Sequence, residues 1–194
     1  MTLGLSTLIR FRISTLRRFV VLASLFLTAV ILLPNDLARA QPSPAKPIKV
    51  LVITGGCCHD YTTQKNLIKE GLESRANFQV TVVQQGGSGT YAKIKLYEDP
   101  NWADDYDVVI HDECFADVKD TAWIQRILKP HQEGKPAVVI HCAMHCYRDG
   151  TDNWFKFCGV TSRGHGAHYA HEVLNRDGEH PIMKGWGAAW ANPA

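Results

Sequence analysis

The chain has 194 residues, 45% of them hydrophobic, and a formal net charge of +2. This length favours one domain and is enough to bury a core without covalent cross-links. The first 40 residues hold five arginines and one aspartate, so the other 154 residues hold 16 basic and 18 acidic ones. The resulting charge of −2 leaves no basic patch of the kind that nucleic acids or anionic membranes require as partners.

The N-terminal segment has the three parts of a secretory signal peptide. Four arginines precede an apolar run of fifteen residues at 19–33, and Ala38-Arg39-Ala40 forms an A-x-A cleavage site. We therefore expect a Sec-type signal peptide over residues 1–40, a Pro-rich linker over 41–47, and export to the periplasm or the medium. An uncleaved membrane anchor is the less favoured alternative, because a span needs about 20 apolar residues.

Apolar runs and helical patterns alternate along the rest of the chain. Strands are predicted, in chain order, at residues 48–54, 78–83, 106–110 and 137–140, with a weaker fifth at 170–174. Helices are predicted at 64–76 and 118–132. This alternation is typical of a parallel α/β sheet with helices on both faces, and the continuous Val/Ile runs indicate strands buried on both sides.

Seven of the nine histidines fall at or near one edge of the predicted sheet. Four of them follow strands: His59, His111, His141 and His145. His165 and His168 lie in the loop before the fifth strand, and His171 lies just inside it. The carboxyl ends of the strands are where open parallel sheets bind ligands. Each of these histidines taken singly is more simply a core or surface residue with satisfied hydrogen bonds. Their concentration at one edge favours a functional site.

Two kinds of chemistry fit this edge. His59, His111 and His145 could hold a divalent metal such as zinc, with Glu113 as a general base, although the spacing matches no zinc signature. The same imidazoles could instead form a proton relay. His145 is expected to point into the site, on one face of a helical turn with Cys142, whereas His141 is expected to support structure.

Cysteine chemistry is less favoured. Cys142 follows a strand, as a nucleophile in a strand–turn–helix elbow would, but Ile140 and Met144 stand where such an elbow has small residues. We therefore expect that Cys142 is not the nucleophile. The six cysteines are expected to be mostly buried thiols with at most one disulfide, because the core is large enough without them.

Five segments together resemble the ThuA-like (trehalose utilisation) family of the class I glutamine amidotransferase-like superfamily. They are KVLVITGGCCHDYTTQK, YDVVIHDECFAD, GKPAVVIHCAMHCYR, GHGAHYAHEV and EHPIMKG, spanning residues 48 to about 187. The resemblance implies a flavodoxin-like three-layer α/β/α sandwich, a role in carbohydrate metabolism and a site at the strand ends. Family members usually continue beyond the last segment, so residues 48–194 are expected to be a domain incomplete at its C-terminus.

Glutamine amidotransferase activity is not expected. Cys142 lacks the flanking glycines of the superfamily elbow, and His180-Pro181 is followed by Ile182 where the acidic partner would stand. The function expected instead is action on a small-molecule carbohydrate, a sugar or modified glycoside, by hydrolase, lyase or isomerase chemistry. The catalytic candidates are His145, Glu113 and His165; the substrate-binding candidates are Tyr61, Tyr147 and Arg148. The alternative is a non-catalytic carbohydrate-binding or interaction domain with the same fold.

Overall fold

The computed structural model describes residues 45–193, so the predicted signal peptide lies outside the described residues. Its strands are β1 (Ile48–Gly56), β2 (Phe78–Gln84), β3 (Val108–Cys114), β4 (Ala137–Val139), β5 (His171–Leu174) and β6 (Ala189–Asn192). Its helices are α2 (Tyr61–Glu73), α3 (Thr121–Gln132) and α4 (Asn153–Cys158), with 3-10 turns η1 (Lys95–Glu98) and η2 (His141–His145).

Four strands form one parallel sheet in the order β2-β1-β3-β4. The chain moves from β1 to one neighbour, β2, and then crosses to the opposite side of β1 for β3. This reversal creates a topological switch point between β1 and β3, where doubly wound folds bind their ligands. The predicted order of alternating strands and helices is confirmed, and the fold is flavodoxin-like.

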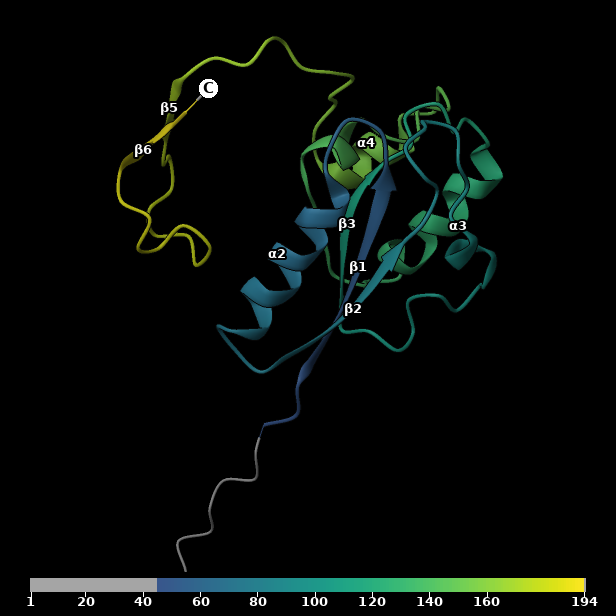
Figure 1. Ribbon diagram of the computed structural model, residues 1–194, viewed down its shortest axis with the longest axis horizontal. Coiled ribbons are helices and arrows are strands. Elements are labelled where there is room, and N and C mark those ends of the chain that lie inside the picture. The colour runs from purple at the N-terminus through teal and green to yellow at the C-terminus, as the bar shows by residue number, and fades with distance from the viewer. Residues whose placement is uncertain (1–44, 194) are drawn as a thin grey trace, which may run out of the picture. The chain divides into compact units, whose positions relative to one another are not determined.

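The sheet is the middle of three layers (Figure 1). On one face, Val50 and Val52 of β1 pack against Ile68 and Leu72 of α2. On the other face, Leu51 and Ile53 belong to a larger core that takes in the apolar faces of α3 and α4. Alternate residues of β1 thus serve opposite cores, which explains its continuous apolar sequence.

Aspartates begin the two long helices. The Asp60 carboxylate accepts a hydrogen bond from the Thr63 amide, 3.0 Å away, and the Asp120 carboxylate accepts one from the Trp123 amide at 3.1 Å. Such N-caps satisfy amides that have no partner within the helix. Asp60 thereby places the start of α2 directly after the loop that leaves β1.

Two strand predictions need correction. The third strand runs on to Cys114, so residues 111–113, expected to follow it, lie inside it. The predicted fifth strand forms as β5, but it pairs antiparallel with β6 in a separate two-stranded sheet. β5 is mostly exposed, so it lacks the apolar faces that a strand inside the main sheet requires.

Residues 45–193 contain no helix that is both long and apolar enough to span a bilayer.

Candidate active site at the carboxyl edge of the sheet

Two glycines shape the loop that leaves β1. A Cβ atom on Gly55 would lie 2.0 Å from the Gln85 carbonyl oxygen, and one on Gly56 would lie 2.2 Å from that of Cys114. Both glycines also have positive φ, at 138° and 97°. The end of β1 therefore passes between two backbones at a distance that only glycine allows. This passage delivers Cys57, Cys58 and His59 to the sheet edge.

The turn after β4 is sharp and left-handed. His141 has a φ of 40°, a conformation that a side chain bearing a Cβ rarely adopts. The following 3-10 turn is held by the Ala143 amide, which donates to the Ile140 carbonyl at 2.9 Å. The Trp154 indole donates to the Ala143 carbonyl at 2.8 Å. The strained residue of this elbow is His141 and not Cys142.

Five imidazoles meet at this edge; we call His59, His141, His145, His165 and His168 the histidine cluster. The His59 and His141 rings are 4.8 Å apart, and Nδ1 of His141 lies 3.1 Å from Nε2 of His59. The His165 ring stacks on His141 at 5.2 Å and lies 5.7 Å from His145. His168 continues the group, 6.1 Å from His165. The cluster joins the β1–α2 loop, η2 and the loop before β5.

His141 is suited to remain uncharged. Partial burial, followed by the positive charges of His59, His165, His145 and His168, lowers the pKa of His141 below its ordinary value. A neutral imidazole can accept a proton, as a general base must. His145 is fixed differently, because its Nδ1–H donates to the Ser162 carbonyl at 3.1 Å.

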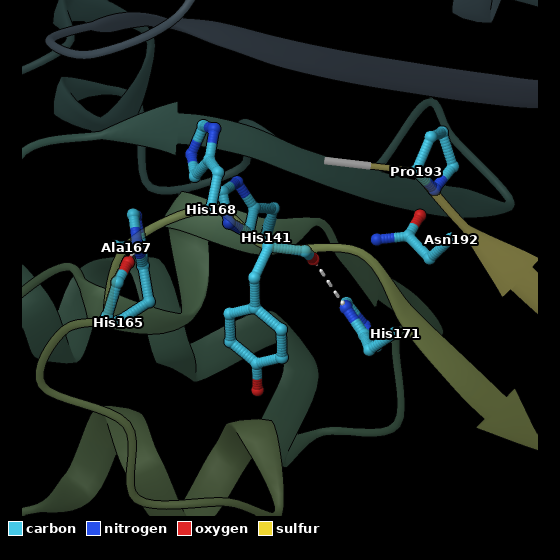
Figure 2. Close-up of a pocket in the computed structure, with 9 residues that line it drawn as sticks. His141, His165, Ala167, His168, His171, Asn192 and Pro193 are labelled. Carbon is cyan, nitrogen blue, oxygen red and sulfur yellow. Dashed lines mark hydrogen bonds between the residues drawn. The ribbon is translucent and has the colours of Figure 1, made fainter.

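The side of the histidine cluster at His141 lines a cavity of about 450 Å³ (Figure 2). Its polar and aromatic walls come from the start of η2, the loop before β5, the start of β5 and the end of β6: His141, His165, His168, Tyr169, His171 and Asn192. The His171 ring N–H is occupied by the Tyr169 carbonyl at 3.0 Å. The volume falls within the range of small-molecule sites, and the lining is polar enough for a ligand rich in hydroxyl groups.

Cys142 lies behind the cluster as a buried thiol. Its Sγ is 2.9 Å from Nε2 of His59. Burial, and then the charge of Cys114, raises the pKa of Cys142 to about 12, so it stays protonated at neutral pH. The ligand atoms of His59, His141 and Cys142 all lie within 4.8 Å of one another. Two nitrogens and one sulfur form a donor set that zinc can use.

The structure does not bring together the predicted metal trio of His59, His111 and His145. His111 points from β3 into the core between the sheet, α3 and α4, where its ring lies 5.4 Å from that of Trp154. Within residues 45–193, two groups of three potential ligands converge within 4.8 Å, and neither contains His111 or His145. The reason is the length of β3, which keeps His111 inside the strand.

Glu113 belongs to the same buried network as His111. Its Oε1 lies 2.9 Å from Nδ1 of His111 and accepts hydrogen bonds from the hydroxyls of Tyr97, at 2.8 Å, and Tyr147, at 3.1 Å. Nε2 of His111 lies 3.0 Å from Nε2 of His131, whose pKa falls to about 4 through burial and then the charge of His111. Glu113 is fully buried, so it is not placed to act on a ligand at the histidine cluster.

The predicted substrate-binding residues are occupied within the protein. Tyr61 is buried and donates its hydroxyl to the Cys57 carbonyl at 3.0 Å, and the buried Tyr147 hydroxyl binds Glu113. Arg148 ties two loops together, donating to the carbonyls of Ala116 and Arg163 at 3.3 and 3.1 Å. Of the six catalytic and substrate-binding candidates, His145 and His165 are the two that belong to the histidine cluster.

His141, which the sequence predicts to support structure, is exposed and lines the cavity. The feature of the sequence that could have indicated this role is the position of His141, immediately after the last residue of the predicted fourth strand. His168 is among the histidines expected at this edge. Tyr169 and Asn192 are not, because only the folded chain brings the end of β6 beside β5.

Comparison with known proteins supports the fold. No family model matches the chain, and no curated protein does. Among solved structures, a protein of Parabacteroides merdae described as ThuA-like matches with a TM-score of 0.55 and 24% sequence identity. The match covers 76% of this chain and 61% of that protein, so the present chain spans less than two thirds of its length. At this identity the likeness shows a shared fold: the molecule is an α/β protein with the fold of a ThuA-like protein.

Proposed function

We propose that this protein is an exported enzyme of carbohydrate metabolism that acts on a sugar or modified glycoside through the histidine cluster. The observation that carries the proposal is the stacked pair of His141 and His165 on the wall of a polar cavity, at the carboxyl edge of the sheet. The ThuA-like fold, with its link to trehalose utilisation, favours a carbohydrate over other small polar ligands.

The chemistry proposed is general acid–base catalysis. Nδ1 of His141 is engaged by His59, which leaves Nε2 of the neutral ring for the substrate. His141 takes a proton from a sugar hydroxyl or from an activated C–H group. His165, one stacking distance away, is the partner that returns a proton to the leaving or rearranging oxygen. This scheme serves a hydrolase, lyase or isomerase equally.

A panel of monosaccharides, disaccharides including trehalose, and oxidised glycosides tests the proposal by product analysis. We expect the wild type to convert at least one member and His141→Gln to lose about 100-fold or more in kcat, as removal of a general base does. His180→Gln is the matched control, because His180 is exposed and lies outside the cluster. Binding without conversion would favour the non-catalytic alternative, and equal activity in His141→Gln would refute the assignment.

The cluster also provides for a metal. Zinc held by His59, His141 and Cys142 would supply an activated water in place of the base. Elemental analysis of protein purified without chelators separates the two schemes: about one zinc per chain, lost in His59→Gln, favours the metal, and a metal-free active protein favours acid–base catalysis.

Export is proposed from the N-terminal pattern, which lies outside the described residues. N-terminal sequencing of the exported protein is expected to begin at Gln41, after the A-x-A site. Recovery of the intact N-terminus on a membrane-bound form would instead support an anchor.

A further inference from the structure

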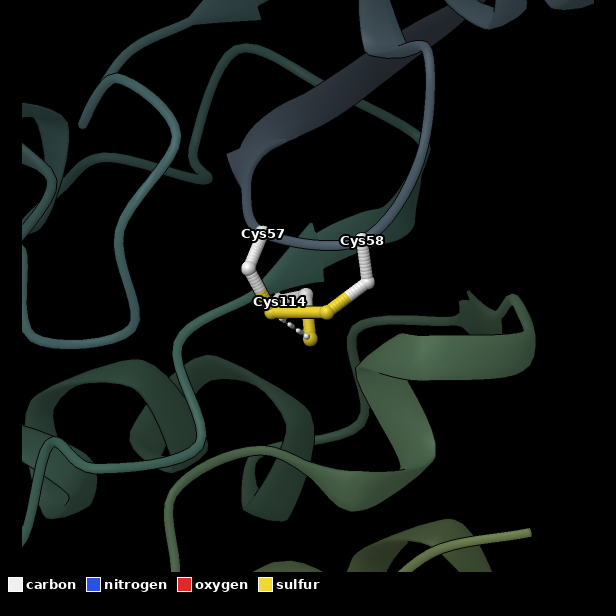
Figure 3. A group of neighbouring side chains, drawn as sticks. All are labelled: Cys57, Cys58 and Cys114. Carbon is white, nitrogen blue, oxygen red and sulfur yellow. Dashed lines mark hydrogen bonds between the residues drawn. A yellow bond between two sulfur atoms is a disulfide. The ribbon is translucent and has the colours of Figure 1, made fainter. Parts of the chain in front are cut away.

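Three sulfur atoms meet at the ends of β1 and β3 (Figure 3). Cys57 and Cys58, adjacent in the chain, form a disulfide. The sulfur of Cys114 lies 3.5 Å from that of Cys57 and has no bonded partner. The backbone fixes this approach, because Cys114 pairs with Gly56 across the sheet and its carbonyl accepts a hydrogen bond from the Cys57 amide at 3.3 Å. The third sulfur is therefore held against the disulfide by the sheet itself.

The three sulfurs differ in access to solvent. Cys58 is exposed, Cys57 is half-buried and Cys114 is buried. A reagent in solution therefore meets Cys58 first, whereas the Cys114 thiol faces Cys57 from within the protein. The nucleophile and its target are thus internal, and the sulfur that would leave is on the surface. The Cys114 sulfur lies beside the disulfide bond, within 4.8 Å of both of its sulfurs, so its side chain must rotate into line with the bond before thiol–disulfide exchange can occur.

We propose that Cys114 exchanges with the Cys57–Cys58 disulfide and so turns Cys58 into a site of thiol modification. The Cys114 sulfur, as a thiolate, forms a bond to the Cys57 sulfur. The Cys57–Cys58 bond breaks, and its electron pair leaves with the Cys58 sulfur, which takes a proton from water to replace the one Cys114 lost. No external oxidant or reductant is consumed. The product has a Cys57–Cys114 disulfide and an exposed Cys58 thiol.

The backbone at Cys58 favours this release. Its φ is 84°, in the region that side chains bearing a Cβ rarely adopt. While Cys58 is bound to its neighbour, the short ring between the two residues restricts this torsion. Once Cys58 is free, the residue can return to an ordinary conformation. Exchange therefore relieves a local constraint at Cys58.

The released thiol has a defined class of reactant. A low-molecular-weight disulfide combines with the Cys58 thiolate to give a mixed disulfide and one free small thiol. Because His59 follows Cys58 directly, modification would displace the imidazole that contacts Cys142 and His141. The exchange itself depends only on the three cysteines and stands whether or not the histidine cluster is catalytic.

Peptide mapping of the full chain tests the exchange without any activity assay. The folded protein is incubated at neutral pH with iodoacetamide and then unfolded at mildly acidic pH with N-ethylmaleimide, which blocks the remaining thiols and stops exchange. The blocked chain is digested with trypsin without reduction. Cys57 and Cys58 share the peptide of residues 50–65, and Cys114 lies in the peptide of residues 96–119. We expect these two peptides to become joined, with the alkyl group on Cys58 located by fragmentation. An unlabelled 50–65 peptide that keeps its internal disulfide would overturn the proposal, as would alkylation of Cys114.

Variants sharpen the test. Cys114→Ser and Cys114→Ala are both expected to abolish the Cys58 label, because the internal nucleophile is gone. Cys158→Ser is the matched control, since Cys158 is a free cysteine on α4, and it should retain the label. With oxidised glutathione as the probe, the wild type should gain one mixed disulfide at Cys58 and the Cys114 variants none. Equal labelling of Cys58 in wild type and both Cys114 variants would refute the internal exchange.

Discussion

At the scale of single residues, the structure reassigns the roles of neighbouring side chains in the segment His141–Cys142. His141 occupies the left-handed position of the elbow and is exposed, whereas Cys142 is buried behind His59. An elbow presents the residue at its strained position to the ligand. In the proposed function, the chemistry at the end of β4 is therefore assigned to the His141 imidazole and not to the Cys142 thiol.

This assignment predicts that the Cys142 thiol of the folded protein reacts slowly with alkylating reagents. Since its pKa is raised to about 12, its thiolate population at pH 7 is more than about a thousandfold below that of an ordinary cysteine. Iodoacetamide should label Cys142 slowly in the folded protein and rapidly once the chain is unfolded in urea, as mass spectrometry of its peptide would measure. Rapid labelling in the native state would restore Cys142 as a candidate nucleophile.

The raised pKa of Asp112 predicts that the free energy of unfolding depends on pH. Burial raises its pKa to about 6 despite the hydrogen bond from Thr54, so the folded state holds the proton more tightly than the unfolded state. The stability that protonated Asp112 contributes below pH 4 is therefore lost as the pH rises through 6. Asp112→Asn should gain up to about 3 kcal/mol in free energy of unfolding at pH 7.5 relative to pH 4. Urea titrations at both pH values measure this.

The exposed Asp105→Asn is the control for that experiment. A gain for Asp112→Asn that is the same at pH 4 and pH 7.5 would show that Asp112 titrates normally in the folded protein.

At the scale of elements, the end of β1 determines where the β1–α2 loop can lie. Gly56→Ala would place its Cβ 2.2 Å from the carbonyl oxygen of Cys114, on a backbone that cannot move without disturbing β3. We expect a loss of roughly 4 kcal/mol or more in the free energy of unfolding. Gly134→Ala is the matched control: its φ of 103° resembles the 97° of Gly56, but its Cβ would meet no atom within 4 Å.

The control variant should lose only the conformational cost of a positive φ, about 1–3 kcal/mol. Chemical denaturation of both variants gives the comparison. Equal losses would mean that the β1–β3 contact can relax, and that the loop bearing His59 is less firmly positioned than the structure indicates.

At the scale of the whole molecule, local pattern was enough to predict the architecture. The apolar runs of β1 and β2 and the periodicity of α3 predicted the parallel sheet and the buried face of that helix. The structure brings five histidines together at the predicted edge, whereas His111 and Glu113 lie in a buried network away from them. His111 and Glu113 look like residues that follow a strand, because polar residues usually end an apolar run; here a buried network of tyrosines and histidines satisfies them inside it.

Three features of the structure are not indicated by any local pattern in the sequence. The left-handed turn at His141 has no glycine to announce it. The approach of His165 and His168 to η2 depends on a loop that closes only in the folded chain. The pairing of β5 with β6 depends on residues far along the sequence. Each arises from tertiary contacts, which propensity and periodicity do not encode.

A sugar that binds against the histidine cluster, as we propose, is detected most directly through the imidazole nitrogens of that cluster. Long-range ¹H–¹⁵N spectra of the histidine rings, assigned with single His→Gln variants, can be recorded while members of the sugar panel are added. We predict that a bound sugar shifts the signals of His141, His165 and His168 together and leaves those of His131 and His180 unchanged. Shifts confined to His131 or His180, or binding that leaves all three cluster signals in place, would contradict the assignment.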